Sequence, residues 1–131
     1  MPVYNEAPFL RSSIQSILDQ SYRDFEFLIL NDDSTDNSEE IILSFKDPRI
    51  NYLKTDKIKI SELLNLGIKR SSGDIIARMD ADDIALPYRL ERQMNFINNI
   101  LETEKRFRMA DFLMAELRSV CLFGKIIFDK D

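Results

Sequence analysis

Three aspartates follow a short apolar run in the second half of the chain. Residues Ile75–Met79 have strand character, and Asp80, Asp82 and Asp83 come directly after them. Two like charges about 4 Å apart repel by roughly 1 kcal/mol in water and about 4 kcal/mol at an effective dielectric constant of 20, so a cation would stabilise such a group. Mg²⁺ and Mn²⁺ suit these oxygen ligands, because they bind one or two carboxylates together with phosphates and water. The pattern therefore predicts a divalent-metal site for a diphosphate, with a solvated turn or a helix cap as the alternative interpretation.

A second acidic loop follows an apolar strand earlier in the chain. The predicted strand Phe25–Leu30 runs into the polar stretch Asn31–Ser38, and a helix with acidic residues in its first turn is expected from Glu39. In parallel sheets covered by helices, ligands bind beyond the carboxyl ends of the strands. Both acidic loops are therefore expected at the same edge of the sheet, where they would form one site.

The elements that must position these loops alternate between strand and helix. The predicted strands are Pro2–Tyr4, Phe25–Leu30, Arg49–Leu53 and Ile75–Met79. The predicted helices are Pro8–Gln20, Glu39–Phe45, Ile60–Ile68 with a left-handed stop at Gly73, and a helix from Pro87 with the apolar stripe Leu90, Met94, Ile97 and Leu101. This alternation predicts an α/β fold with a mostly parallel sheet and helices on both faces. Because the first strand is very short, we expect residues upstream of it.

The composition limits the chemistry that the chain can perform. Its 131 residues are enough for one domain, and 44% apolar with 31% charged residues is typical of a soluble globular protein. The absence of histidine and the single cysteine exclude histidine-based triads, the usual zinc sites and an internal disulfide. A net charge of −5 without a basic run argues against nucleic acid as a partner. Without a signal peptide or an apolar run of about 18 residues, we expect a cytoplasmic protein.

Six segments of the chain match a known pattern in order and spacing. They are Pro2–Glu6, Ser16–Tyr22, Phe25–Asp36, Asp47–Ile50, Leu64–Ile68, and Ala77–Asp83 with Pro87–Leu90. Together they resemble family 2 glycosyltransferases of the GT-A fold, a Rossmann-like α/β fold. The resemblance extends over residues 1–97, the expected nucleotide-sugar-binding domain, and residues 98–131 are expected to form a divergent helical tail with a short strand at its end as one alternative.

The resemblance implies transfer of a sugar from a nucleotide-diphospho-sugar, a UDP-sugar being expected, with inversion at the anomeric carbon. Asp80 and Asp82 would be the D-x-D pair, with Asp82 holding Mn²⁺ or Mg²⁺ and Asp80 near the ribose and the metal. Asp32 would accept a hydrogen bond from the nucleotide base. The base pocket would be lined by Pro2, Val3 and Tyr4. A divalent cation would stabilise the charge that develops on the leaving diphosphate, so histidine is not required.

Each implied role has a structural alternative. Asp32 could cap a turn, Tyr4 could be a core aromatic residue, and Arg78 is expected to be a structurally paired cation rather than a phosphate ligand. A calcium hand at residues 80–91 is disfavoured because Ala85 replaces the required glycine. A nucleotidyltransferase is disfavoured because Asn5–Pro8 is not a glycine-rich phosphate loop.

The chain departs from the family pattern at three places. Asp33 stands where the family usually has glycine, which would tolerate a positive φ better. Lys57–Ile60 replaces an Asn-x-Gly stretch before the third helix. No segment after Ile97 resembles the half that carries the general base, and the acids there lack the expected context; they are Asp111, Glu116, Asp129 and Asp131.

These departures predict a truncated domain, the donor-binding half of a transferase, with little or no sugar transfer of its own. The alternative is a non-catalytic remnant that acts as a binding or interaction module. The expected acceptor is a glycan or a lipid-linked sugar of polysaccharide biosynthesis. Peripheral association with the inner face of a membrane and formation of a homo-oligomer are left open.

Overall fold

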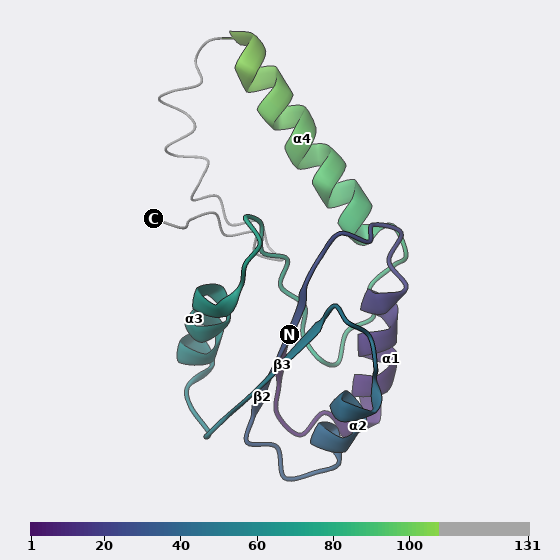
Figure 1. Cartoon of the computed structure of the whole chain (residues 1–131), viewed down its shortest axis with the longest axis vertical. Helices are drawn as coiled ribbons and strands as arrows, with labels where there is room; N and C mark the ends of the chain where they lie inside the picture. Colours follow the sequence, from purple (N-terminus) through teal and green to yellow (C-terminus); the bar gives the residue numbers. More distant parts are fainter. Residues whose placement is uncertain (108–131) are drawn as a thin grey trace.

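The computed structural model describes residues 1–107, whose arrangement is shown in Figure 1. This range contains three strands and four helices: β1 (Pro2–Val3), α1 (Ala7–Leu18), β2 (Phe27–Asp32), α2 (Ser38–Ser44), β3 (Ile50–Thr55), α3 (Ile60–Arg70) and α4 (Arg89–Phe107). The strand predicted as one alternative near the end of the tail, and the acids considered there, lie outside the described residues.

The strands form one parallel sheet in the order β1-β2-β3. Val3 of β1 is level with Asn31 of β2, and Asp32 of β2 is level with Thr55 of β3. Because the three strands run in the same direction, their last residues lie at one side of the sheet, which we call the carboxyl edge. The loops that follow β1, β2 and β3 therefore begin side by side.

Helices cover both faces of the sheet, as predicted. On one face, Ile29 of β2 belongs to the main core together with Leu10 and Ile14 of α1. On the other face, a Cβ atom added to Gly67 of α3 would lie 2.9 Å from Cδ1 of Leu30, so glycine lets this helix approach the sheet closely. Figure 1 shows α1 and α2 on one side of the sheet and α3 on the other.

The predicted helices are confirmed, with ends shifted by a residue or two. Pro8 lies in the first turn of α1, where its missing N–H costs no hydrogen bond. The first turn of α2 contains Glu39 and Glu40, whose charges complement the helix dipole. Helix α4 continues through residues 97 and 98, and Ile97 of its predicted apolar stripe is buried. None of the helices in the described range has the length and apolar character to cross a bilayer.

The predicted strand Ile75–Met79 is wrong. Within residues 1–107 this segment joins no β-ladder. The strand at the free side of the sheet, β1, has two residues, and Pro2 has no N–H to donate, so β1 offers few partners for another strand. A side chain supplies one of the missing hydrogen bonds of this segment instead, because Nη2 of Arg89 donates to the carbonyl of Arg78 at 2.7 Å.

The predicted left-handed stop at Gly73 is also wrong. Helix α3 ends at Arg70, and Ser71 follows in an extended conformation with φ −71° and ψ 146°. The Glu26 carboxylate accepts hydrogen bonds from the amides of Ser72 and Gly73. Amides beyond the helix end are thus satisfied by a side chain, which removes the need for a left-handed glycine cap.

Candidate functional site

The loops after β1 and β2 are bonded to each other at the carboxyl edge. The Asn5 amide donates to Oγ of Ser34 at 3.1 Å, and Oδ1 of Asn5 accepts the amide of Thr35 at 2.8 Å. Asn5 has a positive φ of 55°, a conformation that asparagine tolerates better than most residues. These bonds make one surface of two loops that are thirty residues apart in sequence.

Asp32 is fixed at the end of β2. The residue is 7% exposed. Its Oδ1 accepts hydrogen bonds from the Ile58 amide at 2.9 Å and from Oγ1 of Thr55 at 3.1 Å. The next residue, Asp33, has φ 58°, so the chain turns there in the left-handed conformation expected of the family's glycine. The carboxylate of Asp32 is therefore held by β3 and the loop after it.

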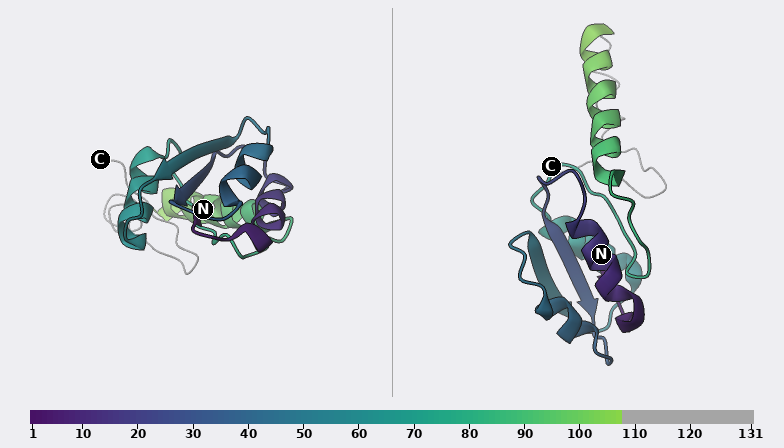
Figure 2. Two further views of the ribbon diagram at one scale, coloured as in Figure 1. Left: turned by 90° about the horizontal axis from the view of Figure 1, so that it is seen from below. Right: turned by 90° about the vertical axis from the view of Figure 1, so that its right-hand side faces the viewer.

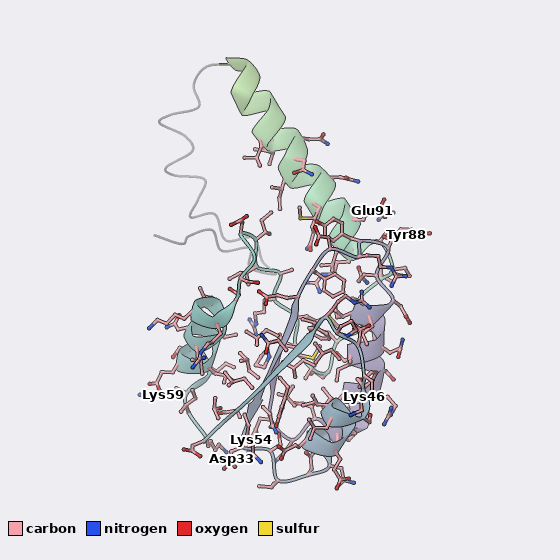
Figure 3. The ribbon with its side chains drawn as sticks, in the orientation of Figure 1. Asp33, Lys46, Lys54, Lys59, Tyr88 and Glu91 are labelled. Carbon is pink, nitrogen blue, oxygen red and sulfur yellow. The ribbon has the colours of Figure 1, made fainter. Side chains whose placement is uncertain are left out.

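A polar network supports the loop that follows Asp32. Asn31 is fully buried, and its side chain donates to the Tyr52 hydroxyl at 3.2 Å and accepts the Ser34 amide at 3.1 Å. The Tyr52 hydroxyl donates in turn to Oε1 of Glu39 at 2.8 Å, and Lys54 donates to the other oxygen of the same carboxylate at 2.6 Å. Asp33 and Lys54 mark this edge in Figure 3, whereas Tyr88 and Glu91 lie beyond the opposite end of the sheet, where α4 begins.

The three residues predicted to line a base pocket lie in and just after β1. Val3 is 1% exposed and belongs to the core. Pro2 is half-buried in the strand. Tyr4 is 42% exposed and is therefore not a core aromatic residue, and the Lys57 ammonium lies 3.8 Å from the centre of its ring.

The acidic loop after residue 79 is held differently. Nη2 of Arg78 forms an ion pair with Oδ1 of Asp80 at 2.6 Å, as expected for a structurally paired cation. The carbonyl of Asp80 accepts a hydrogen bond from Oγ of Ser13 in α1 at 3.4 Å. Asp82 and Asp83 are exposed. The three aspartates thus do not converge on one point, which differs from the expectation based on their spacing.

Electrostatics place Asp82 at the same edge as Asp32. Burial raises the pKa of Glu6, and the negative charges of Asp82 and Asp36 raise it further. Glu6 follows β1 directly and precedes α1, so the charge of Asp82 acts at the carboxyl end of β1. Asp32 ends the neighbouring strand β2. The charge of Asp82 therefore acts next to the strand end that carries Asp32.

Asp36 links the two helices that begin at this edge. Its carboxylate accepts the amide of Ala7 at 3.0 Å and the amide of Ser38 at 2.9 Å, so it satisfies one N–H at the start of α1 and one at the start of α2. Although burial raises the pKa of Asp36, a hydrogen bond with the Ser38 side chain and the hydrogen bonds from backbone amides lower it below its ordinary value. The sequence around Asp36 does not indicate this link, because its partner in α1 lies 29 residues away.

The acids of this edge could supply some, but not all, of the ligands of a hard divalent cation. Within residues 1–107 no group of three or more acidic, cysteine or histidine side chains is arranged to surround a metal. Mg²⁺ and Mn²⁺ do not require such a cage, since one or two carboxylates with phosphates and water are sufficient. In the described part of the chain the Asp82 carboxylate receives no hydrogen bond, and its charge already perturbs Glu6, so a cation at Asp82 would relieve uncompensated negative charge.

A cavity of about 630 Å³ lies elsewhere, between the starts of β1 and β2, the end of α3 and the start of α4. Its lining includes Phe27, Ile68, Arg78 and Leu90, and it excludes Asp32 and Asp82. This cavity is therefore separate from the acidic carboxyl edge.

A parallel sheet between helices, with fixed acids in the loops after neighbouring strands, defines the class of Rossmann-like α/β domains. The sequence profile described as "Glycosyl transferase family 2" matches residues 1–101. The chain therefore belongs to glycosyltransferase family 2, as the resemblance indicated.

Several curated proteins are similar to this chain. An "Uncharacterized glycosyltransferase" of Haemophilus influenzae is 34% identical over 131 residues, which cover 96% of this chain and 52% of that protein. The Escherichia coli protein named "UDP-Glc:alpha-D-GlcNAc-diphosphoundecaprenol beta-1,3-glucosyltransferase WfgD" is 39% identical over 103 residues, covering 76% of this chain and 41% of that protein. The chain thus spans about half or less of the length of these relatives.

Solved structures confirm the GT-A fold. TarS (residues 1–349) of S. aureus aligns with a TM-score of 0.70 and 20% identity, covering 75% of this chain and 31% of that one. The mannosyltransferase PcManGT of Pyrobaculum calidifontis, solved with GDP-Man and Mn²⁺, aligns with a TM-score of 0.59 and 24% identity, covering 63% of this chain and 26% of that one.

Proposed function

We propose that this chain binds a nucleotide-diphospho-sugar together with Mn²⁺ or Mg²⁺ and forms the donor-binding portion of an inverting hexosyltransferase. The observation that carries the proposal is the position of Asp32, a nearly buried carboxylate held by two hydrogen bonds at the same edge as the acidic loop of Asp80 and Asp82. One nucleotide could contact both groups, because its base and its diphosphate lie at opposite ends of the ribose.

On the base side, Asp32 would accept a hydrogen bond from the N–H of a pyrimidine base. Its Oδ1 is already occupied by Ile58 and Thr55, which leaves Oδ2 as the acceptor. The exposed ring of Tyr4 would supply an apolar face, and Pro2 and the backbone of Val3 would complete the wall of the pocket.

On the diphosphate side, Asp82 and Asp80 would hold the cation. A bound Mn²⁺ or Mg²⁺ would stabilise negative charge on the leaving nucleoside diphosphate. Asp82 is free to bind it, whereas Asp80 is restrained by Arg78 and would orient the ribose and the metal from a fixed position.

The names of similar proteins support the choice of ligands. The E. coli relative is named for UDP-Glc and a diphosphoundecaprenol-linked acceptor, and TarS has been solved in complex with UDP and with UDP-GlcNAc. We therefore propose a UDP-sugar as the donor and a glycan or lipid-linked sugar of polysaccharide biosynthesis as the acceptor, with transfer at the cytoplasmic face of a membrane.

No general base is assigned to this chain. The base of an inverting transferase must deprotonate the acceptor hydroxyl, and we propose no acid within residues 1–107 for this step. The proposal is therefore donor binding with little turnover by the 131 residues alone.

Calorimetric titration of the 131-residue chain with UDP, with and without Mn²⁺, tests the proposal. We expect binding that becomes stronger when Mn²⁺ is present. Absence of binding in the presence of Mn²⁺ would favour the alternative of a non-catalytic interaction module. Rapid sugar transfer by the same chain from UDP-glucose to a glycan acceptor would contradict the restriction to donor binding.

A further inference from the structure

One face of α1 carries polar side chains where a core-facing helix would ordinarily be apolar. Ser13 and Ser16 lie on this face, and Gln20 follows the helix end by two residues. Their spacing of three and four positions places them one above another. Figure 2 (right) shows α1 running alongside the segment that precedes α4, and this segment includes residues 80–88.

Gln20 is fully buried and bonds this segment through both ends of its amide. Its Nε2 donates to the carbonyl of Leu86 at 2.7 Å and to the carbonyl of Ser16 at 3.0 Å, and its Oε1 accepts the amide of Leu90 at 3.0 Å. Burial of an amide is unfavourable unless its hydrogen bonds are made, so the side chain can occupy this place only while the segment stays in register with α1.

The two serines continue the same connection toward the acidic loop. Oγ of Ser16 accepts the amide of Ala85 at 3.0 Å, and Oγ of Ser13 donates to the carbonyl of Asp80 at 3.4 Å. The backbone is therefore bonded to α1 on both sides of Asp82. Within the described chain, residues 71–88 contain no helix or strand, so these side chains take the place of a ladder in fixing the loop.

We propose that Gln20 and Ser16 are positioning residues for the metal site, because they set the place of Asp82 at the carboxyl edge through the backbone of the loop. This inference depends on the function proposed above. Neither side chain is among those proposed above to bind the nucleotide or the cation. Removing a residue that orients a metal ligand without binding the metal itself typically weakens metal affinity by about 10- to 100-fold.

The test compares Gln20→Met with Gln15→Met. Methionine is close to glutamine in shape but makes none of the three bonds. Gln15 is an exposed residue of α1, and its Nε2 donates to Oδ1 of Asp19 at 2.9 Å. Each variant is titrated with uridine without metal and with UDP in the presence and absence of Mn²⁺. Uridine affinity reports the base side, and the ratio of the two UDP affinities reports the metal side.

We expect Gln20→Met to reduce the strengthening of UDP binding by Mn²⁺ by about tenfold while uridine affinity stays within about twofold of the unaltered chain. Gln15→Met should change neither. A full Mn²⁺ effect in Gln20→Met, or an equal loss of uridine and UDP affinity, would overturn the inference. Absence of UDP binding by the unaltered chain would instead refute the proposed function.

Ser16 provides a milder perturbation should Gln20→Met fail to fold. Ser16→Ala removes the acceptor for the Ala85 amide and is expected to weaken the Mn²⁺ effect, whereas Ser16→Thr keeps the hydroxyl and should retain it. Equal Mn²⁺ effects in the alanine and threonine variants would contradict the inference.

Discussion

Replacing Asp32 with Asn changes one carboxylate oxygen into an NH₂ group and keeps the shape of the side chain. The remaining oxygen can still accept the hydrogen bonds of Ile58 and Thr55, whose lengths are 2.9 and 3.1 Å. The exchanged atom is then the one that faces the proposed base, where a donor would meet the N–H of the pyrimidine. The substitution therefore removes the base contact while leaving the support of the loop.

The magnitude follows from the type of bond lost. A hydrogen bond to a charged group contributes about 1.5–3 kcal/mol. This range corresponds to a loss of roughly 10- to 150-fold in affinity, since about 1.4 kcal/mol is a factor of ten. The free energy of unfolding should fall by no more than about 1 kcal/mol, because both supporting bonds remain.

Calorimetric titrations with uridine, and with UDP plus Mn²⁺, measure the effect. Both affinities should fall by the same factor, since the perturbation is confined to the base side. Asp33→Asn is the matched control: it removes the same charge one position further on, at an exposed residue whose φ of 58° asparagine tolerates. A folded Asp32→Asn variant that binds uridine as the unaltered chain does would refute the reasoning.

Three further changes give separate tests. Asp82→Asn should abolish the strengthening of UDP binding by Mn²⁺ without changing uridine affinity, and a preserved Mn²⁺ effect in calorimetry would move the metal to other ligands. Gly67→Ala should lower the free energy of unfolding measured in urea, because overpacking costs roughly 1–3 kcal/mol and the better helix propensity of alanine offsets only about 1 kcal/mol. Gly73→Ala is the control and should be tolerated, because its Cβ would meet no atom nearer than 3.7 Å. Hydrogen bonds from Arg49 lower the pKa of Asp47 from 3.8 to about 2, so their stabilisation is present above pH 3.8 and is lost as the pH falls toward 2. Asp47→Asn should therefore reduce stability at neutral pH and make thermal unfolding less dependent on pH across that interval.

Strand β2 and all four helices could be predicted because the signals that define them are local. Pro8, the acidic start of α2 and the apolar run of β2 each act within a few residues of the chain. The replacement of the family's glycine by Asp33 put the shape of that turn in question, and φ 58° shows that Asp33 adopts the left-handed conformation nonetheless.

The segment Ile75–Met79 shows where local reasoning fails. Its composition favours a strand, yet a strand also requires a neighbour with free N–H and carbonyl groups, and the two-residue β1 supplies few of them. Gln20 was missed for a related reason. Its partners Leu86 and Leu90 lie 66 and 70 residues further along the chain, and nothing in the sequence around Gln20 indicates them.

The base side and the metal side of the candidate site are supported by different elements, and this separation has an experimental consequence. Asp32 is held by Thr55 and Ile58, from β3 and the loop after it, whereas the loop of Asp82 is held by side chains on and just after α1. Changes far from each other and without shared partners usually contribute additively. Combining Asp32→Asn with Gln20→Met should therefore lower UDP affinity in Mn²⁺ by the product of the two single effects. A combined loss much smaller than that product would mean that the two loops act as one unit. The hydrogen bonds between Asn5 and Thr35 do not predict this, because they connect the loops after β1 and β2 and not the loop of Asp82.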